Sequence, residues 1–208
     1  MRTILVANRK GGCGKTVTAI TLAAALAGRS GRVGLADADR QKSALRWLRA
    51  RPAGAAPIEA VDWTKDGFGA HPKRLEYLVV DAPGALKGSR AEALVAEADA
   101  MVTPVLPSIF DEESTRRFLR DVEELKRVRK GKVELDLIAN RVRAHARCVA
   151  ELTAFFERIG QVPVAWIAER TAYPDLAAEG LTVFDRRGRS FHGLQEQWRP
   201  LIDRLMAA

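Results

Sequence analysis

A glycine-rich loop near the start of the chain constrains its fold more than any other feature of the sequence. Residues 8–16 read Asn-Arg-Lys-Gly-Gly-Cys-Gly-Lys-Thr. The general phosphate-loop pattern is a Gly, four residues and then Gly-Lys-Ser/Thr, and here Arg9 stands where the first Gly is usual. Glycines in such a loop let backbone N–H groups turn inward around phosphate oxygens, which side chains would obstruct. The run therefore predicts a loop that binds the phosphates of a nucleotide.

Individual residues of the loop have separate expected roles. Lys15 would reach the β- and γ-phosphates, and the Thr16 hydroxyl would ligate Mg²⁺. Lys10 adds a second cation at the start of the loop, which is more than the loop's own nucleotide requires. The residues expected to bind the nucleotide here are Lys10, Gly11, Gly12, Cys13, Gly14, Lys15, Thr16 and Val17.

The segments on either side of the loop suit a nucleotide site. Residues 3–7 form a short apolar run of the kind found in strands that are buried on both faces. Residues 17–27 are rich in Ala, Leu and Ile, as expected of a helix that packs on a sheet. A strand, a glycine loop and a helix N-terminus in that order make an anion-binding site.

Carboxylates stand at the ends of two further predicted strands. Residues 32–37 read as a strand that ends in Asp37, with Asp39 two positions later. Residues 75–81 end in Tyr-Leu-Val-Val-Asp, so Asp81 closes an apolar strand as a Walker B acid does, where it orders the water shell of the metal. An Asp at a strand end also serves simply as a turn former or helix cap. After a phosphate loop, we favour the metal-supporting role.

Chain length and the alternation of elements predict the architecture. At 208 residues, we expect one α/β domain spanning residues 1–208 with a large core. Strand-like and helix-like segments alternate, which predicts a mostly parallel, twisted sheet with helices on both faces. Residues 51–69 contain Pro52, Gly54 and Pro57 and are expected to form a loop with a short edge element.

The sequence also indicates a cytoplasmic location. No apolar stretch reaches the length of a membrane span, and the N-terminus lacks the pattern of a secretory signal. Cys13 and Cys148 are the only cysteines, too few for a disulfide framework.

Several motifs together give the chain a family resemblance. The motifs Lys-Gly-Gly-x-Gly-Lys-Thr at 10–16, Asp-x-Asp-x-Gln-x-Ser at 37–43 and Asp-x-Pro-Gly at 81–84 resemble those of the ParA/MinD group of deviant Walker A ATPases, which are P-loop NTPases of the SIMIBI type. The chain looks most like the short ParF-type ParA proteins, which lack an N-terminal DNA-binding extension. The likeness continues through residues 103–108 and 174–185 and so extends over essentially the whole chain.

This resemblance implies roles for individual residues. Lys10 matches the signature lysine, which crosses to the partner's phosphates in an ATP-sandwich dimer. Lys15 and Thr16 match the ordinary loop lysine and the Mg²⁺ ligand. Asp39 matches the switch I carboxylate that positions the attacking water, and Asp81 matches the Walker B acid.

The resemblance also implies the reaction and completes the set of site residues. Asn140, placed after a predicted strand at 133–139, matches an Asn whose amide reads the adenine edge, and Arg141 follows it in the nucleotide-binding set. The implied reaction is Mg²⁺-dependent hydrolysis of ATP to ADP and phosphate, slow until a partner stimulates it and accelerated by charge stabilisation. The implied catalytic residues are Lys10, Lys15 and Asp39, and the implied metal-site residues are Thr16, Asp39 and Asp81.

At a few positions the chain departs from the family pattern. Val17 stands where a second Thr is common, Arg40 replaces the usual Pro of the switch I motif, and Ala82 stands where Thr is frequent. The Arg40 change leaves switch I either more mobile or more basic towards a partner. None of the three removes a charge that hydrolysis requires.

The charge balance favours a polyanionic partner. The formal net charge is +8 and the isoelectric point about 9.9. One basic cluster falls at the end of a helix expected to begin near Asp111, where cations would equally complement the helix dipole. That cluster comprises Lys126, Arg127, Arg129, Lys130 and Lys132.

A second basic cluster lies near the end of the chain. Arg186, Arg187 and Arg189 precede the last predicted helix, and Arg170 precedes a loop expected at Pro174, where the family has DNA-contacting residues. We expect sequence-independent binding to DNA phosphates.

The resemblance implies a nucleoid-associated homodimer that forms with ATP and dissolves on hydrolysis. A ParB-like or other adaptor would stimulate hydrolysis. Its cargo would be a plasmid, a chromosome or a protein cluster that is segregated or positioned.

Other classes share this fold and remain as alternatives. A MinD-like membrane switch needs a C-terminal amphipathic helix that inserts in lipid, and residues 191–206 have apolar residues at helical spacing. We expect this stripe to pack on the core instead, so we do not expect membrane binding. A nitrogenase-type reductase needs cysteines for a bridging iron–sulfur cluster, and a dethiobiotin-type ligase fits poorly with the two-lysine loop and the basic charge.

Overall fold

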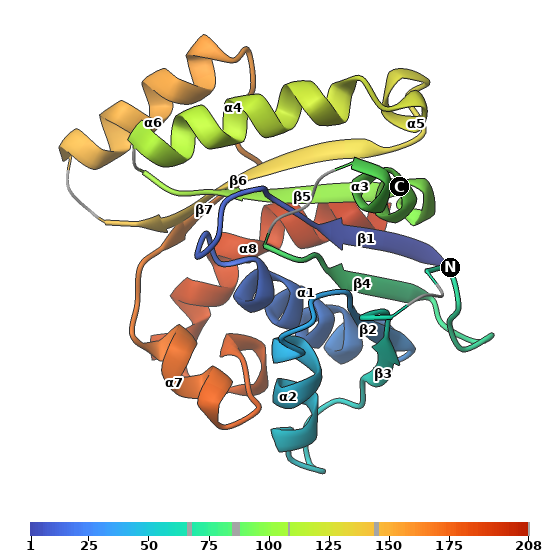
Figure 1. Ribbon diagram of the computed structural model, residues 1–208. Coiled ribbons are helices and arrows are strands. Elements are labelled where there is room, and N and C mark those ends of the chain that lie inside the picture. The colour runs from blue at the N-terminus through green and yellow to red at the C-terminus, as the bar shows by residue number, and fades with distance from the viewer. Residues whose placement is uncertain (66–67, 85–87, 108, 144–145, 208) are drawn as a thin grey trace.

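The computed structural model describes residues 1–65, 68–84, 88–107, 109–143 and 146–207. Its centre is a seven-stranded sheet with the strand order β3-β2-β4-β1-β5-β6-β7, and all of the pairings between described residues are parallel (Figure 1). The parallel sheet predicted from the alternating elements is confirmed. The strands are β1 (Arg2–Val6), β2 (Val33–Asp37), β3 (Glu59–Asp62), β4 (Tyr77–Asp81), β5 (Ala100–Val105), β6 (Glu134–Val142) and β7 (Ala165–Ala168).

Helices cover both faces of the sheet. The helices α1, α2, α7 and α8 lie on one face, and α3, α4 and α6 lie on the other (Figure 1). The helical elements are α1 (Lys15–Ser30), α2 (Ser43–Ala50), α3 (Gly88–Glu97), α4 (Ile109–Glu123), α5 (Lys126–Arg129), α6 (Ala146–Arg158), α7 (Ala172–Ala178), the 3₁₀ turn η1 (Val183–Asp185) and α8 (Arg189–Ala207).

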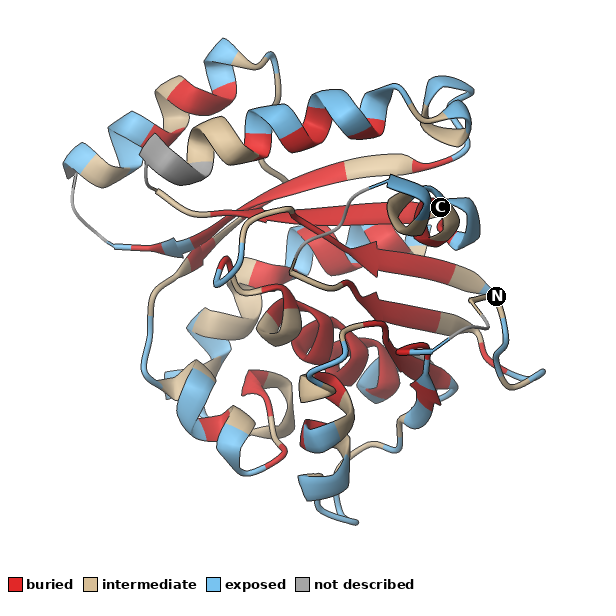
Figure 2. Ribbon diagram, viewed as in Figure 1, coloured by how far each residue is buried: buried red, intermediate tan, exposed pale blue. Residues whose placement is uncertain are grey.

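Strand β1 shows why the central strands read as unbroken apolar runs. Ile4 and Val6 point into the core under α1, whereas Leu5 and Ala7 point into the core on the opposite face. All four residues are fully buried, as the red central strands of Figure 2 illustrate. Burial of a Leu, Ile or Val side chain stabilises the fold by about 1.5–3 kcal/mol, so both faces of the strand favour apolar residues.

The register of the parallel strands brings the predicted site residues to one edge of the sheet. Asp81 at the end of β4 pairs with Val6 at the end of β1 on one side and with Asp37 at the end of β2 on the other. The loop that follows β1 therefore begins beside both carboxylates.

Several predicted boundaries are wrong. Strand β6 continues past Ala139 through an irregularity in its pairing with β7, so Asn140 lies inside the strand rather than after it. Pro174 lies within the first turn of α7 rather than in a loop, a position at which proline costs no helical hydrogen bond. Residues 103–105 belong to β5, and residue 108 of the same predicted motif lies outside the described residues.

The helix predicted to run from Asp111 into the first basic cluster is also divided. Helix α4 ends at Glu123, and Lys126 to Arg129 form the separate short helix α5. The cluster therefore does not extend the long helix; three of its cations, Lys126, Arg127 and Arg129, lie in the last turn of α5 instead.

Predictions for the edge element and for the last helix are confirmed. Strand β3 is the short edge element expected within residues 51–69. The apolar stripe of α8 packs on the core, where Trp198, Leu201, Ile202 and Leu205 are buried. Among the described residues, every helix is too short or too polar to span a bilayer.

Candidate nucleotide-binding site

The loop between β1 and α1 depends on glycine at two positions. Gly12 and Gly14 have φ angles of 76° and 94°, in the region that residues with a Cβ rarely adopt. Gly14 also has no room for a side chain, because a Cβ placed there would lie 2.4 Å from the Asn140 side-chain nitrogen. The glycines thus fix the path of the loop into the N-terminus of α1.

The side chains of Lys15 and Cys13 hold the backbone of the loop through hydrogen bonds. The Lys15 ammonium donates to the Lys10 carbonyl oxygen at 2.9 Å, and the Cys13 thiol donates to the same oxygen at 3.2 Å. Lys15 is only 7% exposed and lies in the first turn of α1. Its charge adds to the positive end of the helix dipole, which makes this loop attractive to an anion.

Asn8 anchors the start of the loop, and sequence reasoning assigned it no role. Its side-chain amide nitrogen donates to the Pro104 carbonyl at 2.9 Å and to the Thr115 hydroxyl at 3.2 Å. Its side-chain oxygen accepts the N–H of Lys10 at 3.2 Å. The signal in the sequence is a polar residue directly after a buried strand, which indicates a buried amide with defined partners.

Asp81 and Thr16 form the candidate metal site. The Thr16 hydroxyl donates to Asp81 Oδ2 at 2.7 Å, and Asp81 Oδ1 is buried with no hydrogen-bond partner in the described part of the chain. Burial raises the pKa of Asp81 to about 7, the Thr16 hydrogen bond opposes that rise, and the nearby charge of Asp37 adds to it. Mg²⁺ takes hydroxyl, carboxylate, water and phosphate oxygens as ligands, so this pair, with its unsatisfied carboxylate oxygen, fits that ion.

Asp37 and Asp39 connect the end of β2 to the site and to α2. Buried Asp37 accepts the N–H groups of Asp39 at 3.0 Å and Leu45 at 3.1 Å, and burial raises its pKa despite these bonds. Asp39 accepts the N–H of Gln41 at 2.9 Å and that of Gly84 at 3.2 Å. Asp39 therefore bridges the segment after β2 and the segment after β4.

A cavity of about 650 Å³ opens beside the loop. Its volume lies within the range of small-molecule sites. Its lining includes Thr16 and Asp39 together with Asn140, Tyr173 and Trp198. The lining thus combines cationic and hydroxyl groups with aromatic side chains, the chemistry that the phosphates and base of a nucleotide require.

Most of the predicted nucleotide-binding residues line this cavity. They are Gly11, Gly12, Gly14, Lys15, Thr16, Val17, Asn140 and Arg141, and predicted catalytic Asp39 joins them. Cys13, itself part of the loop, is buried, and Lys10 is half-buried with its carbonyl oxygen accepting the Lys15 ammonium. Asp81 lies behind Thr16.

Asn140 braces the loop. Its side-chain nitrogen donates to the Cys13 carbonyl at 2.8 Å, which ties β6 to the loop. Arg141, next to it, has a φ of 52°, unusual for a residue with a Cβ, and its guanidinium pairs with Glu169 at 2.7 Å. Sequence reasoning also missed Glu169, although it lines the cavity.

The predicted DNA-binding residues lie in two places. Arg170 lines the nucleotide cavity and donates to the Glu169 carbonyl at 2.8 Å. Arg186 and Arg187 follow η1, and Arg189 is the first residue of α8. Arg187 and Arg189 are exposed, whereas Arg186 pairs with Glu179 at 2.6 Å.

Comparisons with known proteins agree with this geometry. The family model described as the CobQ/CobB/MinD/ParA nucleotide binding domain matches residues 4–183. The protein named Maintenance of carboxysome distribution protein A from Halothiobacillus neapolitanus is 33% identical over 198 residues, which cover 90% of this chain and 90% of that protein. The protein of the same name from Gloeobacter kilaueensis is 31% identical over 217 residues, covering 98% of this chain and 94% of that one.

A solved structure supports the fold independently. The Cyanothece McdA(D38A)–ATP complex superposes with a TM-score of 0.76 at 19% identity, covering 100% of this chain and 96% of that chain.

Proposed function

The chain belongs to the CobQ/CobB/MinD/ParA nucleotide-binding family, and from this premise we propose that it is a ParA-like ATPase that positions a cargo inside the cell. The names of the two relatives described above concern the distribution of carboxysomes. Those names support a protein assembly, rather than a plasmid or chromosome, as the cargo.

The observation that carries this proposal is that the phosphate-loop residues Lys15 and Thr16 line the cavity, with Asp81 bonded to Thr16. Lys15 and the glycine loop would hold the triphosphate of ATP, and the Thr16 hydroxyl with Asp81 would hold Mg²⁺ and its water shell. The ion, when bound, would neutralise charge on the phosphates. Asp39 would orient a water molecule, whose oxygen forms a bond to the γ-phosphorus while the bond to the β–γ bridging oxygen breaks.

Lys10 is positioned to act on a second copy of the chain. Its N–H is held by Asn8, and its carbonyl oxygen accepts bonds from Lys15 and Cys13. With the backbone fixed on both sides, the direction in which the side chain leaves the loop is set in advance, which reduces the entropy lost on binding. We propose that this side chain reaches the triphosphate of the partner subunit in an ATP-bound dimer.

Dimerisation would couple ATP to DNA binding. Arg170, Arg186, Arg187 and Arg189 are the proposed contacts, and the net charge of +8 supports a phosphate-backbone partner. A dimer presents each contact twice, so its affinity for DNA exceeds that of a monomer steeply. Hydrolysis, stimulated by a ParB-like or other adaptor, would dissolve the dimer and release it from the nucleoid.

The burial of the apolar stripe of α8 weighs against the MinD-like alternative. Trp198 and Leu201 are at most 1% exposed, so these side chains are not available to insert in lipid. This burial therefore favours DNA over a membrane as the surface that the ATP-bound form occupies.

The experiment that tests the proposal is a DNA-binding titration with ATP, ADP or no nucleotide, repeated at several salt concentrations. We expect tight binding only with ATP and Mg²⁺, and a steep decline of the affinity with salt. Equal binding in all three nucleotide conditions would refute the coupling.

A further inference from the structure

The segment that contains α2 carries positive charges and no negative ones, and the roles assigned above do not involve them. Residues 40–51 carry five cations, at positions 40, 42, 46, 49 and 51, and no carboxylate. Such a run next to a nucleotide site marks a surface that favours anions.

Helix α2 divides this segment into a buried face and a basic face. Ala44 and Trp47 are buried against the core, whereas Arg46 and Arg49 are exposed and, at a spacing of three residues, lie on one side of the helix. Lys42 differs from these arginines, because its ammonium pairs with Asp62 at 2.6 Å.

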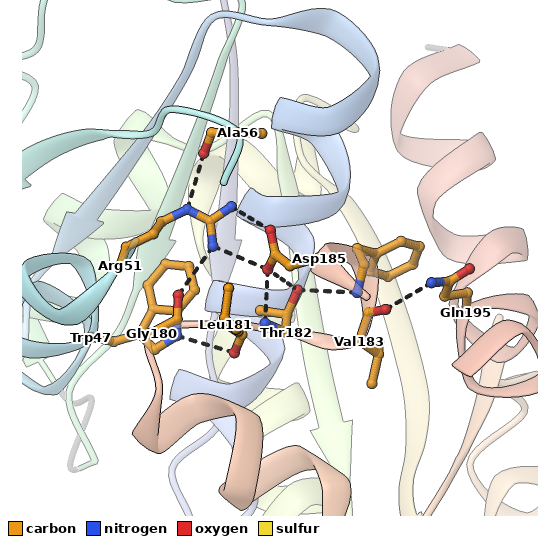
Figure 3. A network of polar contacts seen from close by, with 10 residues as sticks. Trp47, Arg51, Ala56, Gly180, Leu181, Thr182, Val183, Asp185 and Gln195 are labelled. Carbon is orange, nitrogen blue, oxygen red and sulfur yellow. Dashed lines mark hydrogen bonds and ion pairs between the residues drawn. The ribbon is translucent and has the colours of Figure 1, made fainter. Parts of the chain in front are cut away.

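A buried ion pair joins α2 to the second basic cluster (Figure 3). Arg51 donates to the two carboxylate oxygens of Asp185 at 2.7 and 3.1 Å, and the two side chains are only 5% and 7% exposed. Arg51 also lies over the Trp47 ring, 5.0 Å from its centroid. Asp185 directly precedes Arg186, so this pair fixes the start of the cluster to α2.

The end of α2 also packs directly against residues 180–181, which precede the second basic cluster. The Trp47 ring N–H donates to the Leu181 carbonyl at 3.3 Å, and a Cβ at Gly180 would lie 2.4 Å from the carbonyl group of Ala50. Gln195 of α8 holds the far side, where its side chain donates to the Val183 carbonyl at 2.7 Å (Figure 3). The same nitrogen donates to the Arg186 carbonyl at 3.0 Å. The end of α2 and the start of the cluster at 186–189 are therefore held against each other.

The first turn of α2 is bonded to the nucleotide site. The N–H of Leu45 donates to Asp37, and the N–H of Lys42 donates to the Asp39 carbonyl at 2.9 Å. Asp39 lines the cavity. The helix thus lies between the proposed catalytic carboxylate and the basic cluster.

We propose that the exposed face of α2, with Arg46 and Arg49, joins Arg186, Arg187 and Arg189 in one surface that binds the backbone of double-stranded DNA. This inference rests on the proposed function and extends the DNA-binding surface to a helix that is bonded to the nucleotide site.

The burial of the apolar face of α2 selects DNA over an anionic membrane. A helix that lies on a membrane inserts apolar side chains between the lipids, in addition to its attraction for their headgroups. Trp47 is only 5% exposed and Ala44 is fully buried, so the exposed side of α2 offers cations without an apolar wedge. Binding to phosphates along a rigid duplex needs only those cations.

The test compares two double variants of equal charge. Arg46→Gln/Arg49→Gln changes the proposed surface, and Arg117→Gln/Arg120→Gln on α4 is the control, because those arginines have the same spacing, are exposed and lie on the opposite face of the sheet. The affinity for mixed-sequence duplex DNA is measured with ATP as a function of salt concentration. The slope of log K against log salt is negative. We expect the α2 variant to reduce its magnitude by about 1.8 per subunit, that is about 0.9 for each phosphate that the variant no longer neutralises.

The control and a charge-preserving variant complete the design. We expect the α4 control to change the slope by less than about 0.9, and Arg46→Lys/Arg49→Lys to keep the original slope, because both charges remain. Equal slopes for the α2 variant and the α4 control overturn the inference.

The outcomes also separate this inference from the proposed function. If the unchanged protein shows no ATP-dependent DNA binding, the proposed function fails, and the inference fails with it. If the unchanged protein binds DNA with ATP and the α2 variant does so with the same slope, the inference alone fails. Flotation with phosphatidylglycerol vesicles gives one more contrary result, namely vesicle binding that Arg46→Gln/Arg49→Gln abolishes while DNA binding persists.

Discussion

Replacement of Gly14 by Ala tests the geometry of the phosphate loop. Gly14 has a φ of 94°, and its missing Cβ leaves the space that the Asn140 amide occupies. An alanine there would force a backbone conformation that costs about 1–3 kcal/mol for a residue with a Cβ. It would also push the Asn140 nitrogen away from the Cys13 carbonyl, to which it donates at 2.8 Å.

The magnitude follows from three contributions. Loss of the Asn140 hydrogen bond adds about 0.5–1.5 kcal/mol to the backbone strain. The lower entropy of an unfolded chain with Ala in place of Gly returns about 0.4–1 kcal/mol. Together these give a loss of about 0.5–4 kcal/mol in the free energy of unfolding for Gly14→Ala.

The same substitution elsewhere in α1 provides the control. Gly28 is exposed in the helix and has nothing within 4 Å of an added Cβ. Gly28→Ala should therefore raise the free energy of unfolding by about 0.5–1 kcal/mol. Urea denaturation without nucleotide measures both variants. If Gly14→Ala unfolds at the midpoint of the unchanged protein or above it, the loop does not depend on glycine at position 14 and the reasoning is refuted.

Other substitutions test the nucleotide switch and the ion pair that holds α2. Lys10→Ala should keep monomeric ATP binding in calorimetry but lose the ATP-dependent dimer in sedimentation and also lose DNA binding; a variant that still dimerises contradicts its role. Asp39→Ala should bind ATP, stop hydrolysis and stay on DNA, and rapid release from DNA in a dissociation assay would argue against its catalytic assignment. Asp185→Ala leaves a buried guanidinium at Arg51 and should cost about 3–5 kcal/mol in urea denaturation. Glu179 forms an exposed ion pair with Arg186, so Glu179→Ala should lower the free energy of unfolding by less than about 1 kcal/mol. Similar losses in the two variants would refute the distinction between a buried and an exposed ion pair.

The phosphate loop and the central sheet could be predicted because their signals are local. The glycines, Lys15 and Thr16 follow one another in the sequence, and a strand buried on both faces needs an unbroken apolar run. Asp81 was predicted because it closes such a run. Register then placed it beside Asp37, as parallel strands of similar length require.

Features that depend on tertiary contacts could not be predicted. Asn140 lies within β6 because pairing with β7 continues past an irregularity at Ala139, and the sequence does not encode that partner locally. The buried bonds of Asn8 reach Pro104 and Thr115, roughly a hundred residues away along the chain. The Arg51–Asp185 pair likewise joins residues that only the folded chain brings together.

The most direct test of the switch is the structure of the Asp39→Ala variant bound to ATP and Mg²⁺. We predict a twofold dimer in which the Lys10 ammonium of each subunit lies within hydrogen-bond distance of the triphosphate held by the other subunit. A monomer, or a dimer in which the Lys10 side chains point into solvent, would contradict the account.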